Sequence, residues 1–318
     1  MLKRIYTKKL IVCAVAIFTI LLLYIIPTNN ENITYKEEIE YVNKDIETST
    51  IFLLDSNNYL ASTEIITTNK DIENKAKELL EALIIDGSKQ DSIPNGFKAI
   101  IPSNTKILSL TYKDNLIKVD FSNELMNTNI DNEEKIIEAI VYTLTSIENV
   151  EFVIIYMDGN ILTTLPQSKI TLPSTLDRSF GINKEYNLNS TKDINKTTIY
   201  YISEFNDKEY YVPVTKVNND ERSKIEIIID ELSSSNLYKT NLMSYLNNNA
   251  ELISVNESED EMIVNFNSAI FNDINTKEIL EEVIYTISMS INDNYNVNTV
   301  VFNVEDEEIY KSVLKSIE

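Results

Sequence analysis

The residues best placed to do chemistry are four carboxylates that lie near the ends of predicted strands. They are Asp55, Asp120, Glu124 and Asp158. Two carboxylic acids standing ~5–10 Å apart in a groove can act as the general acid and base of a glycoside hydrolase. However, Asp120 lies on the outward side of an alternating strand, and Asp158 before Gly159 is typical of a tight turn. The pattern therefore favours turn-forming carboxylates over a carboxylate-dependent wall hydrolase.

Ser122 and the acidic run Glu257–Glu261 are the next candidates. A nucleophilic Ser needs a base, and the chain contains no His, so Ser122 is expected to serve a turn or a cap. The acidic run could attract Ca²⁺, since hard cations take carboxylate oxygens. It lacks the Gly and the spaced ligands of a calcium loop, so it is expected to form a solvated turn that keeps a strand edge charged. We therefore assign no catalytic residue, no metal site and no cofactor.

The amino-acid composition excludes further classes of site and partner. The 318-residue chain has 28 Lys+Arg against 50 Asp+Glu, a net charge of −22, with one Cys and neither His nor Trp. The lack of His excludes His-based catalytic triads and His metal ligands, and a single Cys excludes an intrachain disulfide. The negative charge argues against nucleic acid, anionic lipid and wall polymer as partners. It fits a basic protein partner instead.

The N-terminal sequence predicts a membrane anchor. Residues 1–9 form a basic tail, and in the apolar run 10–26 only Thr19 is polar. Such a run reaches the short end of the length that spans a bilayer as a helix. Because the basic residues precede the run, the positive-inside rule places the tail in the cytoplasm and everything after Pro27 outside it. Residues 27–49 are polar and are expected to form a stalk.

Two other kinds of N-terminal segment fit the sequence less well. A cleavable signal peptide would end in a small-x-small site, and none follows the run. A lipoprotein signal would place its Cys at the end of the apolar run, whereas Cys13 lies near the start and follows Val12. Cys13 is therefore expected to be an ordinary apolar residue of an uncleaved span.

Beyond the stalk, the same order of elements occurs twice at a spacing of about 145 residues. Strands are indicated by alternation and β-branched residues, and helices by apolar residues three and four apart. In the first copy, residues 50–165, the predicted elements cover 50–54, 59–63, 72–84, 106–112, 116–121, 131–144 and 150–157. In the second copy, residues 198–318, they cover 198–202, 211–215, 225–232, 251–255, 262–266, 275–287 and 297–304. Residues 166–197 are rich in Asn, Ser and Lys, and are expected to be a linker, with an edge strand of the first module at Ile170-Thr171-Leu172 as the alternative.

Several helix ends can be predicted from single residues. Gly87 stands where the C-terminal cap of the first helix belongs. Asp131 with Glu134 resembles a capping box, and the matching helix of the second copy is expected to start near Asn275. These patterns predict an α+β protein of two tandem modules, each with two helices packed on a mixed or antiparallel sheet, preceded by a transmembrane helix.

Both copies carry a Tyr-Thr pair on the second helix, Tyr142-Thr143 and Tyr285-Thr286. We interpret the two pairs as equivalent positions of the repeat. Tyrosine at such positions usually packs its ring in the core while its hydroxyl finds a partner. An intersubunit contact is the alternative role.

Four motifs of the first copy occur in an order known from one family. They are Ile101-Pro102-Ser103-Asn104-Thr105-Lys106-Ile107-Leu108, Val119-Asp120-Phe121-Ser122, Ala139-Ile140-Val141-Tyr142-Thr143-Leu144 and Met157-Asp158-Gly159. Together they resemble the GerMN domain of the GerM family of sporulation and spore germination proteins. The second copy resembles it more weakly, with Asn247 at the Pro102 position, Asn265 at the Asp120 position and no Gly matching Gly159.

The resemblance implies a non-enzymatic function and a location. Modules of this family resemble the ring-building folds of secretion-type assemblies, and its members help to position components of the channel complex between mother cell and forespore. The implied protein is a single-pass membrane scaffold whose modules lie in the intermembrane space during sporulation. Its implied partners are channel-complex proteins, with self-association as a further option.

The alternative hypothesis is a surface-anchored module that binds a small ligand or a cell-wall polymer. Family members are often lipoproteins, and this chain departs from them because Cys13 is not in a lipoprotein signal. No partner-binding residue is assigned from the sequence.

Overall fold

The computed structural model describes residues 47–234, 241–258 and 260–314. No helix within these residues is long and apolar enough to span a membrane. The predicted tail 1–9, the anchor 10–26 with Cys13 and the stalk up to residue 46 lie outside the described residues. Those assignments therefore stay predictions.

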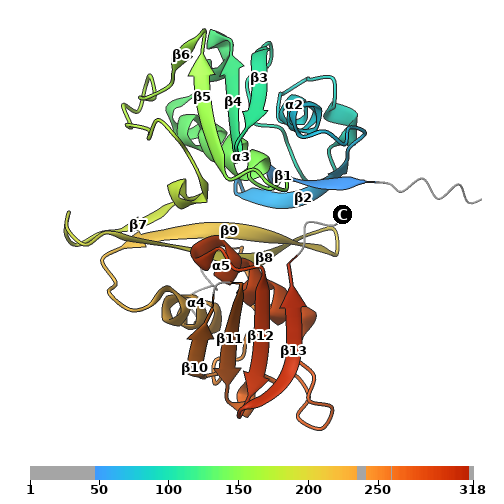
Figure 1. Cartoon of the computed structure of the whole chain (residues 1–318), viewed down its shortest axis with the longest axis vertical. Helices are drawn as coiled ribbons and strands as arrows, with labels where there is room; N and C mark the ends of the chain where they lie inside the picture. The colour runs from blue at the N-terminus through green and yellow to red at the C-terminus, as the bar shows by residue number, and fades with distance from the viewer. Residues whose placement is uncertain (1–46, 235–240, 259, 315–318) are drawn as a thin grey trace, which may run out of the picture. The chain divides into compact units, whose positions relative to one another are not determined.

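The first module consists of a β-hairpin, two helices and a four-stranded sheet (Figure 1). Its elements are β1 (Thr48–Leu54), β2 (Leu60–Ile66), α2 (Ile72–Ala82), η1 (Gln90–Ser92), β3 (Ile107–Lys113), β4 (Leu116–Phe121), η2 (Asn123–Met126), α3 (Ile130–Leu144), β5 (Phe152–Met157) and β6 (Asn160–Ile161). The sheet has the order β3-β4-β5-β6, in which β4 and β5 run parallel and the other pairs antiparallel. β1 and β2 form a separate antiparallel hairpin.

The second module repeats this plan. Its elements are β8 (Asn195–Phe205), β9 (Lys208–Asn218), α4 (Lys224–Ser233), β10 (Leu252–Glu257), β11 (Glu261–Phe266), η5 (Ser268–Ile270), α5 (Glu281–Tyr295), β12 (Thr299–Val304) and β13 (Glu307–Val313). The sheet has the order β10-β11-β12-β13, with β11 and β12 parallel. The predicted α+β class and the repeated order of elements are confirmed. The sequence did not predict β13, which follows a tight turn at Glu305-Asp306, where both residues have positive φ.

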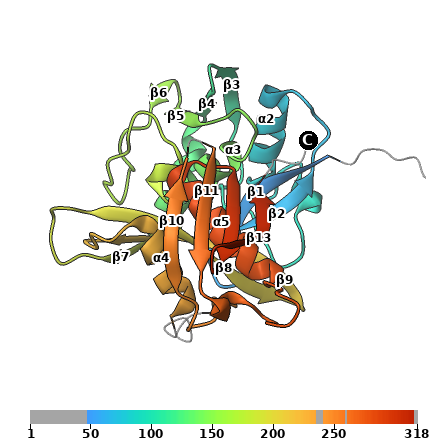
Figure 2. The same cartoon turned by 60° about the horizontal axis from the view of Figure 1, so that its bottom comes forward.

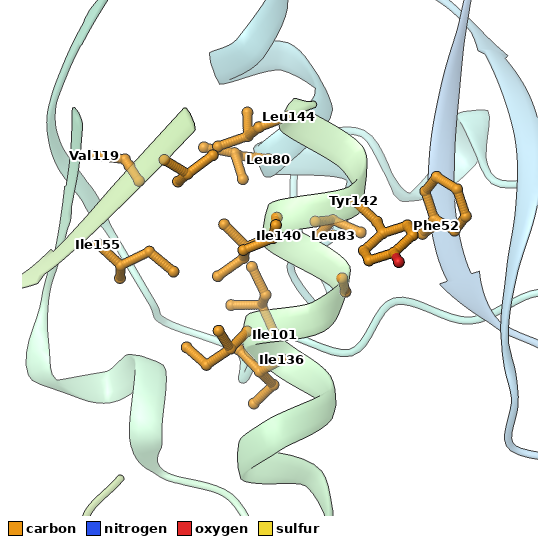
Figure 3. Packing of buried hydrophobic residues seen from close by; sticks show 14 of the residues in the cluster. Phe52, Leu80, Leu83, Ile101, Val119, Ile136, Ile140, Tyr142, Leu144 and Ile155 are labelled. Atoms are coloured by element: carbon orange, nitrogen blue, oxygen red, sulfur yellow. The ribbon is translucent and has the colours of Figure 1, made fainter. Parts of the chain in front are cut away.

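The central helix of the first module is buried on two sides, which differs from the predicted arrangement of both helices on one sheet. α3 packs between β1 and β5. Figure 3 shows Ile140 pointing toward Ile155 of the sheet, while Tyr142 points the other way, to Phe52 of β1. The Tyr142 and Phe52 rings meet edge to face with centroids 5.3 Å apart. The Thr143 hydroxyl accepts a hydrogen bond from the buried N–H of Phe52 at 3.0 Å, so the helix also satisfies the backbone of the hairpin.

The same bond recurs in the second module and defines how the two helices correspond. The Ser290 hydroxyl of α5 accepts the N–H of Tyr200 in β8 at 2.9 Å. When the helices are aligned on these two hydroxyls, Tyr142 corresponds to Met289. The predicted equivalence of Tyr142 and Tyr285 is therefore wrong by one helical turn. Buried pairs at the same offset support this alignment: Ile136 with Val283, Ile140 with Ile287 and Leu144 with Ile291.

Three predicted helix ends are also wrong. α3 begins at Ile130 because Asn129, rather than Asp131, caps it by accepting the N–H of Asn132 at 3.0 Å. α2 ends at Ala82 with Leu83 as its cap, so Gly87 lies beyond the helix. α5 begins at Glu281, because Asp273 holds residues 273–278 in a turn before the helix.

The segment 166–197, predicted as a linker, contributes to the first core. Its apolar side chains at Leu172, Leu176, Phe180 and Ile182 are buried there. The segment also contains η3 (Arg178–Phe180) and β7 (Glu185–Asn187), and β7 pairs in parallel with β9. A polar composition hid these residues because each apolar side chain stands alone among polar neighbours.

The bond between α3 and the hairpin leads to a first prediction. Thr143→Val keeps the shape of the side chain but leaves the buried N–H of Phe52 without an acceptor. We expect the free energy of unfolding to fall by about 1–3 kcal/mol. The exposed Thr111→Val in β3 serves as the control and should change it by less than about 0.5 kcal/mol. Urea unfolding followed by circular dichroism measures both, and equal effects would contradict the role given to Thr143.

Candidate functional site: the junction of the two modules

The carboxylate of Asp120 holds a turn. Both of its oxygens accept the N–H of Gly159, each at 3.1 Å, across the turn between β5 and β6. In the second module Asn265 accepts the N–H of Asp306 at 3.1 Å and donates its own amide to the Asp306 carboxylate at 2.7 Å. Asp306 thus occupies the Gly159 position. Asn265 therefore takes the place of Asp120 in the module whose turn residue, Asp306, is itself negatively charged.

The neighbouring candidates have similar local roles. Asp158 accepts a hydrogen bond from the side chain of Asn123. The Ser122 hydroxyl accepts the N–H of Lys106 at 2.9 Å, and its hydrogen bond to Glu124 lowers the pKa of that carboxyl. Within the described part of the chain, no three acidic or Cys side chains gather as metal ligands. These residues therefore serve turns and strand ends in the structure.

Asp55 has a different role, because it reaches the other module. Its buried carboxylate accepts the N–H groups of Asn57 and Tyr59 at 2.8 Å each. It also accepts the hydroxyl of Tyr210, which lies in β9 of the second module, at 3.0 Å. Burial together with the Asp55 carboxylate raises the pKa of Tyr210 to about 12, against the hydrogen bond from Ser203. Tyr210 therefore stays a hydrogen-bond donor across the physiological pH range.

Beyond this contact, β2 of the first hairpin lies beside β9 of the second hairpin. The two strands are linked by side chains and do not form a sheet. The Ser62 hydroxyl donates to the carbonyl of Tyr211 at 3.1 Å. Ala61 of β2 is fully buried in the core of the second module. The junction is thus partly apolar and partly polar.

Asn183 joins three elements at the junction. Its side-chain amide accepts the N–H of Leu60 at 2.9 Å and donates to two carbonyls, those of Leu60 at 2.7 Å and Pro213 at 2.8 Å. Its backbone N–H donates to Glu138 of α3 at 2.9 Å. Glu138 also pairs with Lys184 at 3.0 Å, and both side chains are almost completely buried. One residue of the presumed linker therefore joins β2, β9 and α3.

Arg178 fixes the other end of the junction. Its guanidinium forms an ion pair with Asp293 of α5, donates to the Ser146 hydroxyl just beyond α3 at 2.9 Å and lies 4.9 Å from the ring centre of Tyr142 in α3. Tyr200 of β8 donates its hydroxyl to the same Asp293 at 3.0 Å. Burial lowers the pKa of Arg178, but the charge and hydrogen bond of Asp293, together with Tyr200 and Tyr142, raise the pKa overall. The cation is therefore permanently charged and joins one helix from each module.

The two tyrosines singled out by the sequence differ in their environment. Tyr142 is buried, as expected, and its hydroxyl donates to the carbonyl of Arg178 at 3.1 Å. Tyr285 is half-buried, and its ring centre lies 6.1 Å from that of Tyr211. Only Tyr142 therefore supports the junction directly.

Sequence reasoning missed the two central junction residues, Arg178 and Asn183. One signal was present, because Arg4, Arg178 and Arg222 are the only arginines of the chain. Arg178 also lies between the apolar residues Leu176 and Phe180, which is unusual for a solvated linker. The partners of both residues are distant in sequence, so their contacts could not be inferred from local pattern.

The junction joins two copies of a module that other proteins also contain. A family model described as "Germane: Sporulation and spore germination" matches residues 50–163 and 198–310. The chain belongs to the Germane family. The resemblance to GerM proteins inferred from four motifs is thereby confirmed.

Comparison with individual Germane proteins supports the same assignment. The chain is 30% identical over 280 residues to the spore germination protein GerM of Bacillus subtilis, covering 85% of this chain and 76% of that protein. The solved structure of the tandem GerMN domains of the sporulation protein GerM from the same organism superimposes with a TM-score of 0.75 at 28% identity. This match covers 85% of our chain and 97% of the solved one, so the similarity includes both Germane modules.

The buried ion pair of the junction leads to a second prediction. Arg178→Ala leaves Asp293, whose side chain is 1% exposed, buried without its cation, and we expect a loss of about 3–5 kcal/mol of unfolding free energy. Arg222 provides a matched control, because its pairs with Asp220 and Asp230 are solvent-exposed and Arg222→Ala should cost about 0–1 kcal/mol. Urea unfolding of the two variants measures the difference. Similar losses would contradict the structural role of Arg178.

Proposed function

We propose that this protein is a membrane-anchored, extracytoplasmic scaffold of sporulation and germination that acts through protein–protein contacts. The observation that carries the proposal is the junction, which holds two Germane modules together through buried contacts at Asp55, Asn183 and Arg178. A scaffold must present its surfaces at fixed spacing. Similarity to GerM of Bacillus subtilis supports the link to sporulation.

The polar groups of the junction are engaged within the protein, which supports a structural role for them. The Asn183 amide uses its oxygen and its nitrogen in hydrogen bonds, and the Arg178 guanidinium has partners in both modules. Buried polar groups that are fully bonded rigidify a structure and define one arrangement. We therefore propose a non-enzymatic function for the two modules.

Location and partners follow from the sequence and the family. The predicted anchor at 10–26 would hold both modules outside the cytoplasm, in the space between mother cell and forespore during sporulation. The proposed partners are proteins of the channel complex that joins these two compartments. With a net charge of −22, the protein would favour partners with basic surfaces.

The alternative function, binding of a small ligand or a wall polymer, has one observation in its favour. An open hollow of about 630 Å³ lies beside α2, and Lys77 and Lys106 are among its lining residues. The hollow also contains Glu81 and Asp86, and none of its lining residues is aromatic, although stacking on aromatic rings is a common way to hold a sugar. We therefore rank this alternative second.

Deletion of the gene tests the proposed function. We expect a large fall in heat-resistant spore counts with unchanged vegetative growth, because the scaffold would be needed only once the forespore forms. The control is restoration of the counts by a wild-type copy at another locus. Normal spore counts in the deletion strain would reject the proposal. Saturable binding of the purified protein to peptidoglycan would favour the alternative function instead.

A further inference from the structure

Each four-stranded sheet has two outer edges, and the first module covers part of each edge with its own chain. At one edge, α2 packs against β3, and Glu73 of α2 accepts the N–H of Tyr112 at 2.8 Å. At the other edge, Leu176 bonds to the backbone of Val153 in β5, where the short β6 has ended. Covered edges of this kind prevent pairing with other chains.

In the second module, β13 forms one edge and carries charges of both signs. Lys311 of this strand pairs with Glu261 at 2.5 Å, and Glu307 forms an ion pair with Lys277. A lysine on an edge strand opposes pairing with another strand, because its charge would have to be desolvated. β13 is therefore a guarded edge.

The opposite edge, β10, is open among the described residues (Figure 2). Because the N–H of Ser258 bonds to Glu261 in the hairpin, alternation directs the N–H groups of Val255 and Glu257 away from β11, up to a β-bulge at Ile253. No described residue bonds to these two outward N–H groups. The side chains of Ile253 and Val255 are 55% and 38% exposed.

The helix that could have covered this edge packs elsewhere. α4 lies mainly against β8 and α5, whereas its counterpart α2 lies against the edge strand β3. When the two helices are aligned on their N-caps, Asp71 and Ser223, the position of Glu73 is occupied by Ile225. Ile225 is buried in the second core and cannot supply a carboxylate to β10. The two modules therefore differ in whether a helix lies against this edge strand.

The charge along the β10 edge indicates what kind of strand would bind there. Residues 251–261 contain five acidic residues and no Lys or Arg. Of these, Glu251 and Glu257 flank the outward-facing groups and are exposed. A strand with Lys or Arg beside its apolar residues would be attracted, because opposite charges on adjacent strands stabilise pairing. A second copy of this chain would bring the same acids together and be repelled.

We propose that the β10 edge accepts an extended, basic segment of a partner protein as a fifth strand of the second sheet. This inference deepens the proposed scaffold function and rests on it. Backbone hydrogen bonds to Val255 and Glu257 supply the affinity, and the acidic surroundings select a Lys- or Arg-bearing strand. The partner surface is thus a strand edge on one module only.

Fluorescence anisotropy with two labelled peptides tests the inference on the full-length protein in detergent. The basic probe is Lys-Val-Lys-Val-Thr-Val-Lys, and the acidic probe has Glu in place of each Lys. We expect saturable binding of the basic probe and at least about tenfold weaker binding of the acidic one. Hydrogen exchange should slow at Val255 and Glu257 when the basic probe is bound.

Two substitutions at one position separate strand pairing from charge attraction. Val255→Pro removes an outward N–H without changing the charge, and proline is tolerated on an edge strand where its nitrogen faces outward. We expect the basic probe to bind about tenfold more weakly, because the variant has lost one backbone hydrogen bond to it. Val255→Thr keeps the N–H and should bind within about twofold of wild type. Thermal unfolding confirms that both variants are folded.

Three results would overturn the inference. They are equal binding of the basic probe by Val255→Pro and wild type, exchange protection confined to β3 or β13, and a concentration-dependent dimer that Val255→Pro abolishes. Because binding is measured without spores, failure here leaves the scaffold function standing. Conversely, normal spore counts in the deletion strain would reject the scaffold function while leaving a measured strand site intact.

Discussion

The burial of one helix on two sides determines how each module is built. α3 packs on the four-stranded sheet with one face and on the β1–β2 hairpin with the opposite face, and α5 packs in the same way between β12 and β8. Because the helix lies between the hairpin and the four-stranded sheet, the hairpin strands cannot pair with the strands of that sheet. Each hairpin therefore keeps a strand edge whose backbone groups need partners once they are buried. The two hairpins meet along these edges, with β2 beside β9.

Side chains, rather than a continuous ladder of backbone bonds, satisfy this contact. Asn183 bonds to β2 and β9 at once, and Pro213 removes one donor from the edge of β9. A buried ion pair such as Arg178–Asp293 adds little net stability, because desolvation offsets most of the attraction. Its geometric demands are strict, however, since any shift of the modules would leave a charge unpaired. The junction therefore defines the arrangement of the modules more than it raises their stability.

Local pattern was sufficient to predict the strands, the repeat and most of the helices, because alternation and three–four spacing report directly on which face is buried. It failed where several residues offered the same signal. Asn129 and Asp131 are both good caps, and the repeated Tyr-Thr pair suggested an alignment that the bonds of Thr143 and Ser290 correct by one turn. The junction was beyond local reasoning, because Arg178 and Asp293 are 115 residues apart. Nothing near Arg178 in the sequence indicates that distant partner.

The two modules share one plan but differ at their sheet edges, and one aligned helix position differs with them. Glu73 faces outward from α2 and bonds to the edge strand, whereas Ile225 at the same position of α4 turns inward to the core. The aliphatic side chain at this position stabilises the second core by apolar burial, and α4 lies against β8. Among the described residues, β10 lacks the cover that α2 gives to β3. A duplicated module can therefore gain an interaction edge through a change in core packing, while the junction keeps that edge at a fixed position relative to the first module.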